Sequence, residues 1–167
     1  MPTNPSVIAA IEQQFPNVAK SEFRGETRVV IPAESAPAAM RWLKDVQGFD
    51  LLVDVTCVDY LHYREDRPDR FGLVYLLAST VTNDRLTVRV FLGEANPRIA
   101  SVVPLWEGAN WMEREVFDMF GIVFEGHPDL RRILMPENFT AYPLRKDYPL
   151  QGRGERHNFP VLTRAKT

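Results

Sequence analysis

Residues 110–150 carry the sequence NWMEREVFDMFGIVFEGHPDLRRILMPENFTAYPLRKDYPL, which joins a helical pattern to a proline-spaced one. Before and within this stretch, apolar residues recur at steps of three and four, the spacing that places one apolar stripe on a helix face. They are Val102, Leu105, Ala109, Met112, Val116 and Met119. Ser101 is suited to cap the start of this helix, and Gly121 is suited to end it in a left-handed conformation. The spacing predicts a helix over residues 102–120.

The opposite face of this helix is charged. Arg114 and Asp118 stand four residues apart, so we expect an ion pair between them, worth about 0.5 kcal/mol or less where it is exposed. Glu113 and Glu115 flank the arginine on either side of the helix and require other cations. The nearest ones follow the helix, at Arg131, Arg132, Arg145 and Lys146. We predict that these groups form a structural network of ion pairs that fixes the path of the chain beyond the helix.

Beyond residue 120, prolines interrupt the chain about every ten residues, which excludes long helices and central strands. They are Pro128, Pro136, Pro143, Pro149 and Pro160. The same segment contains too many large apolar side chains to remain in water, and a long irregular segment of this kind needs a surface to lie on. We predict a globular domain over residues 1–120. Residues 121–167, the tail, are predicted to pack on this domain and on a partner subunit.

The preceding chain predicts two further helices and five strands. The helices are expected at 5–15 and 32–47, and the strands at 18–24, 26–31, 51–58, 71–78 and 85–92. The strand at 51–58 is apolar on both alternating sets of residues, a pattern typical of a central strand. The order α-β-β-α-β-β-β-α predicts the fold class, a two-layer α/β sandwich of the α+β type with helices on one side of a mixed sheet.

Composition limits the classes of function. The chain has 167 residues, 45% of them apolar, which fits one globular domain, and its net charge of -2 argues against a nucleic-acid partner. Residues 1–120 contain 12 basic and 17 acidic groups, whereas residues 121–167 contain 8 and 5. A cationic tail therefore follows an anionic body. The tail either folds back on that body or reaches an anionic surface on a neighbouring chain.

The sequence contains no apolar run long enough to predict a membrane span. Its N-terminus lacks the pattern of an export signal, so a reducing cytoplasm is the simplest compartment. The single cysteine, Cys57, lies in an apolar run and is predicted to be an inert core thiol.

An acid/base or metal site is the alternative interpretation of the charged cluster, because Glu113, Glu115, Asp118 and His127 are residue types that such sites use. The spacing argues against it, since Glu113 and Glu115 point about 200° apart on a helix. Glu115 and Asp118 have a suitable spacing, but only His127 and Cys57 offer further ligands. The sequence has no CxxC pair, HExxH motif or glycine-rich phosphate loop. We therefore expect His127 to be structural.

Five short segments occur in a fixed order after residue 112: ERE at 113–115, DMFG at 118–121, GHP at 126–128, LRRIL at 130–134 and PLRKDYP at 143–149. Together they resemble the signature of the C-type, or 30 kDa-type, subunit of the proton-pumping NADH:quinone oxidoreductase, respiratory complex I. Chloroplast-type and hydrogenase-type relatives share this family. A match of this length and order is far more specific than one short motif.

The resemblance implies a structural subunit that has no active site of its own. In this family the folded body belongs to the peripheral arm, on the cytoplasmic side of the cell membrane, next to the D-type subunit. The D-type and B-type subunits together form the quinone-reducing region. Flavin mononucleotide and iron–sulfur clusters belong to other subunits, and the assembly transfers electrons from NADH to quinone and translocates protons. We therefore expect a hetero-oligomer in which a cofactor-free chain braces the D-type subunit, and in which this chain also contacts the B-type and other peripheral-arm subunits.

The resemblance implies no catalytic, cofactor-binding or metal-binding residue. It assigns a structural or subunit-interface role to Glu113, Arg114, Glu115, Asp118, Gly121, His127, Pro128, Arg131, Arg132, Arg145, Lys146, Asp147 and Tyr148. Two alternatives remain. The chain could be the equivalent subunit of a ferredoxin- or hydrogenase-linked relative, in which NADH is not the donor, or a free-standing acid/base or metal enzyme with its own pocket of converging polar groups.

Overall fold

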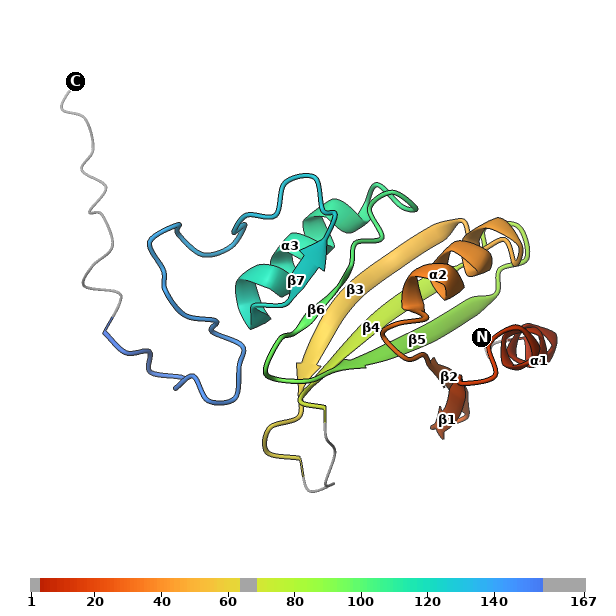
Figure 1. Ribbon diagram of the computed structural model, residues 1–167, viewed down its shortest axis with the longest axis horizontal. Coiled ribbons are helices and arrows are strands. Elements are labelled where there is room, and N and C mark those ends of the chain that lie inside the picture. Colours follow the sequence, from red (N-terminus) through yellow and green to blue (C-terminus); the bar gives the residue numbers. More distant parts are fainter. Residues whose placement is uncertain (1–3, 64–68, 155–167) are drawn as a thin grey trace.

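A computed structural model of the chain describes residues 4–63 and 69–154. Its main sheet has the order β1-β2-β5-β4-β3; β2 and β5 run parallel, and the other neighbours are antiparallel. The predicted sandwich with a mixed sheet is confirmed (Figure 1). The elements in chain order are α1 Pro5–Gln14, β1 Ala19–Phe23, β2 Glu26–Val30, α2 Ala36–Asp45, β3 Leu51–Asp59, β4 Phe71–Ala78, β5 Arg85–Leu92, β6 Arg98–Ala100, α3 Ala109–Phe120 and β7 Val123–Glu125.

Local sequence sets the first elements. The side chain of Asn4 accepts a hydrogen bond from the Ser6 N–H at 3.0 Å, and Pro5 occupies the first turn of α1, where its missing N–H costs little. Arg24 and Gly25 both have positive φ, at 53° and 79°, and they join β1 to β2 in a tight turn. The predicted hairpin at Gly25 is confirmed.

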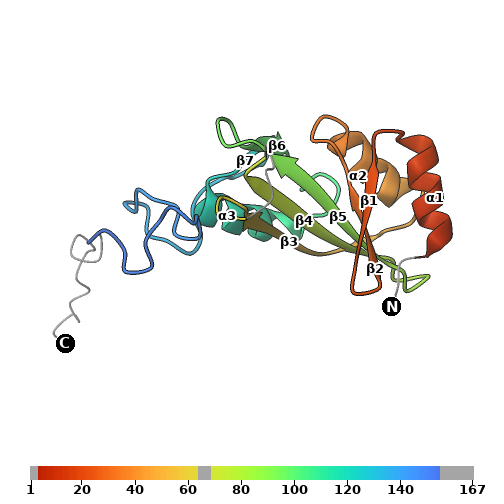
Figure 2. The same cartoon turned by 90° about the horizontal axis from the view of Figure 1, so that it is seen from below.

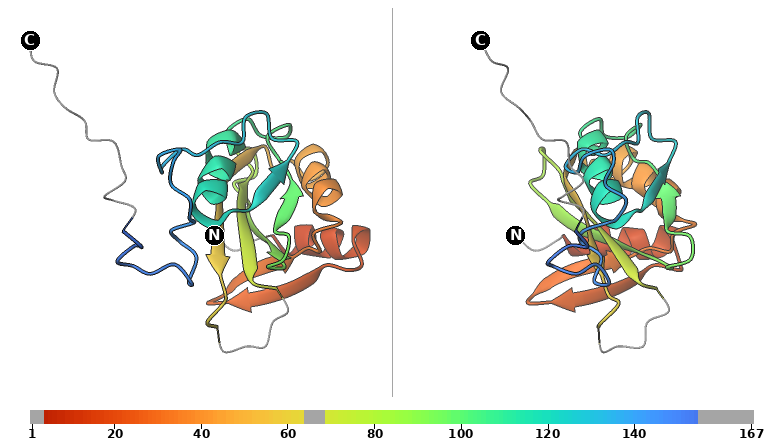
Figure 3. Two further views of the ribbon diagram at one scale, coloured as in Figure 1. Left: turned by 60° about the vertical axis from the view of Figure 1, so that its left-hand side comes forward. Right: turned by 90° about the vertical axis from the view of Figure 1, so that its left-hand side faces the viewer.

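The core lies on one face of the main sheet. On β4 the inward residues Leu73, Tyr75 and Leu77 are at most 1% exposed, and the alternate residues of β5 that pair beside them are equally buried. Helices α2 and α3 lie over this same face (Figure 3). Because each fully buried aliphatic side chain contributes about 1.5–3 kcal/mol, this one-sided core is the main source of stability. Its helical members include Val7, Ile8, Ile11, Ala39, Met40, Leu43, Ala109, Val116 and Met119.

The position of β3 differs from the prediction. Its sequence predicts a central strand, but β3 lies at the edge of the sheet. Its inward residues are buried, whereas Leu51, Val53 and Val58 point to the other side and are 46%, 48% and 39% exposed. The predicted central position is wrong because it assumes one covered face and one partly covered face, and in the described part of the chain the second face is open.

The start of α3 also differs. The apolar spacing predicts a helix from residue 102, but α3 begins at Ala109, and residues 102–108 form turns in which Leu105 N–H and Trp106 N–H donate to the Val102 carbonyl. In one continuous helix, residues 102 and 113 would be separated by about 16 Å. They are instead joined by a hydrogen bond of 2.7 Å from Val102 N–H to the Glu113 carboxylate, which requires the chain to reverse. The predicted end at Gly121 is confirmed.

The tail leaves the body at the end of the sheet opposite α1 (Figure 2). Its first residues still belong to the core: Ile122 and Phe124 are 0% and 2% exposed, and β7 pairs in parallel with β6. The domain division at residue 120 stays a prediction, and residues 155–167 of the predicted tail, with Pro160, lie outside the described residues. Among the described helices, none has both the length and the apolar character needed to cross a bilayer.

Candidate functional site

Asp118 of α3 holds the first part of the tail through its carboxylate. Oδ2 accepts hydrogen bonds from three consecutive backbone N–H groups, those of Ile133, Leu134 and Met135, at 3.0, 2.7 and 2.8 Å. Oδ1 lies 2.6 Å from Nη1 of Arg132, and the Asp118 side chain is fully buried. One carboxylate therefore closes a turn of the tail against the helix. We call these five residues the Asp118 site.

The pKa of Asp118 lies below its ordinary value of 3.8. Burial acts in the opposite direction, because it disfavours the charged form of a carboxyl group. The backbone N–H groups of residues 133–135 and the Arg132 guanidinium favour the charged form and outweigh burial. Ionised Asp118 therefore stabilises the fold above its ordinary pKa, and this contribution is lost as the pH falls through the lowered one.

The two arginines at this junction also bind backbone carbonyls. Arg132 donates to the carbonyl of Asp118 at 3.3 Å and to that of Ala141 at 3.2 Å. Arg114 donates from Nε to the Arg131 carbonyl and from Nη2 to the Arg132 carbonyl, both at 3.1 Å. The predicted ion pair between Arg114 and Asp118 is wrong, because the Asp118 oxygens bind Arg132 and the tail backbone while Arg114 turns toward the carbonyls. The predicted network left its cations open among Arg131, Arg132, Arg145 and Lys146, and of these Arg132 pairs with Asp118.

Glu113 is buried and makes no ion pair within the described residues. Its Oε2 accepts a hydrogen bond from the Ser101 hydroxyl at 2.6 Å, and its Oε1 accepts one from Val102 N–H at 2.7 Å. The prediction that Glu113 answers an arginine is therefore wrong, and its partners lie in the turn before α3. Burial raises the pKa of Glu113 to about 7, and the two hydrogen bonds oppose this only in part.

Glu113 predicts a pH-dependent stability. Between its ordinary pKa of 4.5 and the folded value of about 7, the folded state holds a proton that the unfolded chain releases, so unfolding becomes easier as the pH rises. As the pH rises from 4.5 to 8, we expect the unfolding free energy of the wild type to fall by about 3 kcal/mol relative to that of Glu113→Gln, which has no carboxyl group at this position. Urea unfolding of both proteins across this range measures it.

The matched control is Glu115→Gln, because Glu115 lies on the same helix and is exposed. Its unfolding free energy is expected to follow the wild type at every pH. Parallel curves for Glu113→Gln and the wild type would contradict the buried, proton-binding role of Glu113.

Gly121 allows the ring of Tyr142, a later residue of the tail, to pack directly against the end of α3. Its φ is +74°, and a Cβ atom here would lie 2.5 Å from the Tyr142 ring and 2.8 Å from Nη2 of Arg145. Both the backbone conformation and the close contact therefore require glycine. Arg145 was predicted to answer the helix carboxylates. It instead donates from Nε to the Phe120 carbonyl at 2.6 Å and stacks on Tyr142, 4.6 Å from the ring centroid.

A second charged cluster lies where β3 ends and β4 begins. Arg70 donates to both oxygens of Asp59, at 3.0 and 2.7 Å, and it also pairs with Glu94 at 2.6 Å and with Asp147 of the tail at 2.8 Å. The Lys146 backbone N–H donates to Oδ2 of Asp59 at 2.8 Å. The side chains of Arg70 and Asp59 are 4% and 0% exposed. We call these five residues the Arg70 cluster; it fixes the second part of the tail.

The Arg70 cluster shifts two pKa values in a consistent way. Burial by itself raises the pKa of Asp59, but the hydrogen bonds from Arg70 and from the Lys146 and Leu61 N–H groups outweigh it, so this pKa lies below 3.8. The hydrogen bond to Arg70 is also the main cause of the lowered pKa of Asp147. Sequence reasoning missed Arg70, since it ends a charged loop and stands 77 residues from Asp147.

His127 has two hydrogen-bond partners in the turn after β7. Asp129 N–H donates to Nδ1 at 3.0 Å, so Nε2 carries the proton and lies 3.1 Å from the Asn110 carbonyl. The ring thus joins this turn to the start of α3. The remaining predicted site residues lie at the surface or in simple contacts. Glu115 and Pro128 are exposed, Arg131 pairs with Asp129 at 2.9 Å, the side chain of Lys146 has no part in the Arg70 cluster, and Tyr148 packs edge-on against Phe139.

The outer surface of the α3–tail junction exposes large apolar groups beside charged ones. Trp111 is 64% exposed and its ring centroid lies 5.4 Å from the Arg114 guanidinium, and the tail exposes Leu134, Leu144 and Leu150 by 60%, 51% and 107%. We call these four residues the α3–tail surface. Asp118 and Arg114 are buried, whereas Glu115, Arg131 and Lys146 are exposed. Large apolar groups exposed together are typical of a surface that another protein covers. Within the described ranges, no group of three or more His, Cys, Asp or Glu side chains is placed to hold a metal ion.

Comparison with known proteins identifies relatives of the chain. The model of the family described as the respiratory-chain NADH dehydrogenase 30 kDa subunit matches residues 29–154. A similar protein, the C-type subunit of the NADH-quinone oxidoreductase of Geobacter metallireducens, is 46% identical over 153 residues, which are 91% of this chain and 93% of the relative.

Solved structures agree in fold. The trypsin-resistant fragment (1-134) of Nqo5 superposes with a TM-score of 0.69 and 40% identity, covering 74% of this chain and 98% of that fragment. A chain of the membrane-bound sulfane sulfur reductase, described as an archaeal respiratory membrane complex, superposes with a TM-score of 0.73 and covers 97% of this chain and 94% of that one. Its identity of 23% supports a shared fold alone.

Proposed function

The chain belongs to the family of the 30 kDa subunit of respiratory-chain NADH dehydrogenase, and from this we propose that it braces the quinone-site subunit, the D-type one. Its relatives are subunits of multisubunit, membrane-associated respiratory complexes, so it functions in a hetero-oligomer. In our proposal the chain lies in the peripheral arm on the cytoplasmic side of the membrane. The quinone-site subunit occupies the α3–tail surface, and the B-type and other peripheral-arm subunits lie nearby.

One observation carries this proposal. The charged groups of the Asp118 site and the Arg70 cluster bond to the tail itself, and Trp111, Leu134, Leu144 and Leu150 remain exposed at the surface. The charges therefore give the tail a defined shape, and the exposed side chains supply apolar area to a partner. Large exposed aromatic and aliphatic groups beside a rigid backbone are the usual centre of a stable interface.

The chain itself carries no reaction step in this proposal. Iron–sulfur clusters of the common types require four cysteine ligands, whereas the sequence contains only Cys57. Burial raises the pKa of the Cys57 thiol to about 12, which keeps it protonated and unreactive. Flavin mononucleotide and the clusters reside in other subunits. The assembly transfers electrons from NADH to quinone and translocates protons, and this subunit keeps the quinone site in shape.

The equivalent subunit of a ferredoxin- or hydrogenase-linked complex is the second candidate. The fold shared with a chain of the archaeal respiratory complex is compatible with both candidates. The identity of 46% to an NADH-quinone oxidoreductase subunit favours the first candidate. To distinguish the two candidates, the assembled complex is purified and its activity is compared with NADH and with reduced ferredoxin as the electron donor.

We expect apolar-to-charged changes on the tail to weaken binding of the quinone-site subunit. The double variant Leu134→Asp/Leu144→Asp removes two exposed leucines and introduces two charges into the proposed interface, so co-purification of the quinone-site subunit is expected to fall about tenfold or more. Val81→Asp is the control, since Val81 is 88% exposed in the turn between β4 and β5. Undiminished recovery of the quinone-site subunit with the double variant would reject the α3–tail surface as its binding site.

A change at Arg114 tests whether this subunit is structural. Arg114→Ala leaves the Arg131 and Arg132 carbonyls without their donors, so less complex is expected to assemble. NADH:quinone turnover per assembled complex is expected to equal that of the wild type. Quantitative immunoblots of native gels give the amount of complex, and an activity assay on the same membranes gives turnover. Full assembly with abolished turnover would show a direct catalytic role.

A further inference from the structure

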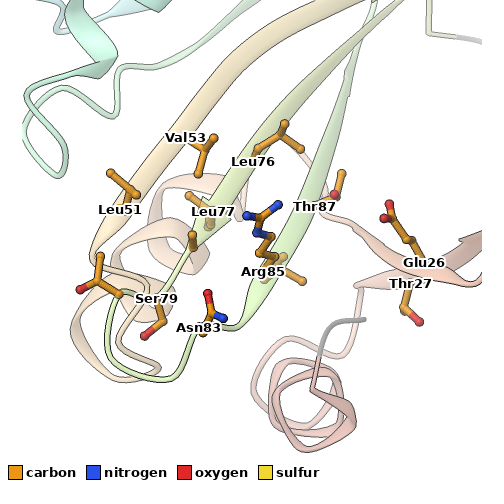
Figure 4. A pocket seen from close by; sticks show the side chains of 13 residues that line it. Glu26, Thr27, Leu51, Val53, Leu76, Leu77, Ser79, Asn83, Arg85 and Thr87 are labelled. Atoms are coloured by element: carbon orange, nitrogen blue, oxygen red, sulfur yellow. The ribbon is translucent and has the colours of Figure 1, made fainter. Parts of the chain in front are cut away.

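The outward side of β3, β4 and β5 is a second surface that the described chain leaves uncovered, and we call it the open face. It is hollowed next to the β1–β2 hairpin, where a groove of about 480 Å³ lies between Glu26 of β2 and the outward side chains of the three strands. Figure 4 shows Leu51, Val53, Leu76 and Arg85 pointing to this one side. The core, to which α1 contributes Val7, Ile8 and Ile11, lies with α2 and α3 on the opposite side of these strands.

The apolar half of the open face lies on β3 and β4. An antiparallel edge strand with one face in water normally alternates apolar and polar residues. β3 departs from this rule in part, since Leu51, Val53 and Val58 are exposed by 46%, 48% and 39%, whereas Asp54 and Thr56 on the same side are polar. Leu76 and Val74 of β4 are the register partners of Asp54 and Thr56 and add apolar area to this side. The described part of the chain leaves this apolar area uncovered.

The cationic half lies on β5. Arg85 and Arg89 stand four residues apart on the same outward side, and neither pairs with a carboxylate in the described ranges. The Arg89 guanidinium is held over the rings of Tyr60 and Phe91, at 5.7 and 5.4 Å from their centroids. Glu26 and Asp54 also border this side, but no ion pair joins either of them to these arginines. Arg89, which these rings hold in place, and the exposed Arg85 therefore flank the apolar strip.

We propose that the open face binds one amphipathic helix of another subunit of the complex, with its apolar stripe on β3 and β4 and carboxylates directed at Arg85 and Arg89. This rests on the proposed membership of the complex. Three strands spaced about 4.8 Å apart present a strip about 10 Å wide, the diameter of one helix. A helix there turns the two-layer sandwich into a three-layer one. Arg85 and Arg89 are separated by about 13 Å along β5, which corresponds to carboxylates about two helical turns apart.

Two other occupants fit the charges poorly. The C-terminal residues outside the described part, 155–167, contain Glu155, Arg156, Arg164 and Lys166, so they bring a net positive charge to the arginines of β5. A second copy of the chain bound symmetrically would bring the arginines of both protomers into one interface, so it adds cations as well as carboxylates. A partner of negative charge matches the open face better than either of them.

A photo-crosslinker identifies the occupant in the assembled complex. A benzophenone amino acid replaces Val53, and the control replaces Val46, which is 64% exposed at the end of α2 on the other side of the sheet. We expect the Val53 position to cross-link to a helical peptide of another subunit that carries Asp or Glu beside its apolar stripe, at a yield about tenfold above Val46. Cross-links to residues 155–167, to a second copy, to lipid, to a peptide without carboxylates, or none at all, would overturn the proposal.

A charge reversal tests the same surface without a label. Arg85→Glu is expected to lower the amount of this chain in the complex about tenfold, whereas Arg41→Glu, an exposed arginine of α2, leaves it unchanged. Equal melting temperatures of the isolated variants exclude misfolding. If Arg85→Glu assembles normally while Leu134→Asp/Leu144→Asp does not, the open-face proposal fails and the proposed function stands. If the wild-type chain is absent from the complex, the proposed function itself fails.

Discussion

Replacing Asp118 by asparagine is expected to lower the free energy of unfolding by about 3–5 kcal/mol, the usual cost of breaking a buried ion pair from one side. Asparagine has nearly the same shape, so the change removes charge and one acceptor without opening a cavity. The amide cannot accept from the three N–H groups of residues 133–135 and from Arg132 at once, and its own N–H₂ group faces donors. Urea unfolding at pH 7 measures the loss.

Hydrogen exchange locates the effect of Asp118→Asn. The amide protons of Ile133, Leu134 and Met135 are expected to lose protection first, because their acceptor is the group that changes. Glu115→Gln serves again as the matched control and is expected to change stability by about 0.5 kcal/mol or less, since Glu115 is exposed. A loss for Asp118→Asn as small as that of the control would mean that the carboxylate does not hold the tail.

Local patterns predicted most of the fold. The strands at 71–78 and 85–92 begin and end where the structure has them, because alternation with a period of two and a polar turn at 79–84 specify a hairpin without distant contacts. The end of α3 was also predicted from local sequence, since glycine is the residue that most readily takes the left-handed conformation that ends a helix. The start of α3 was not, because it depends on the buried Glu113, which binds a turn eleven residues earlier.

The residues of the candidate site were largely predicted, but their contacts were predicted only in part. A pair between a helix carboxylate and one of the later cations was expected, and Asp118 with Arg132 is such a pair. Arg114 and Arg145 were assigned to carboxylates but bind carbonyls, because a helix end and an irregular tail leave many backbone acceptors without partners. A guanidinium with five donors satisfies several of these acceptors at once. The sequence shows where the charged side chains lie along the chain, but it does not show which backbone carbonyls will lack a hydrogen-bond donor.

The two charged clusters hold different parts of the tail. The Asp118 site fixes residues 132–135 and the Arg70 cluster fixes residues 146–147, while Tyr142 and Arg145 pack under Gly121 between them. A segment without helix or strand hydrogen bonds is thus given one conformation by side chains of the body. A preformed tail loses less conformational entropy on binding, so in the proposed complex the clusters contribute to affinity without touching the partner.

Replacing Arg70 by methionine is the second change with a large expected effect. It leaves the carboxylate of Asp59, which is 0% exposed, without its cation, and it removes the ion pair that holds Asp147. We expect a loss of about 3–5 kcal/mol in unfolding free energy. Arg98→Met is the control, because Arg98 and Glu125 form an ion pair in which both side chains are about half exposed, at 49% and 52%; its loss is expected to stay below about 1 kcal/mol.

A double-mutant cycle separates the ion pair from the packing of the arginine. Asp59→Asn/Arg70→Met is expected to be more stable than the sum of the two single losses by about 2 kcal/mol, because removing both charges leaves neither one buried alone. The Lys146 amide proton should also lose protection from hydrogen exchange in each variant, since its acceptor is Asp59. Strict additivity with an unchanged Lys146 amide would show that Arg70 stabilises the protein through its aliphatic contacts, and that the Arg70 cluster does not hold the tail.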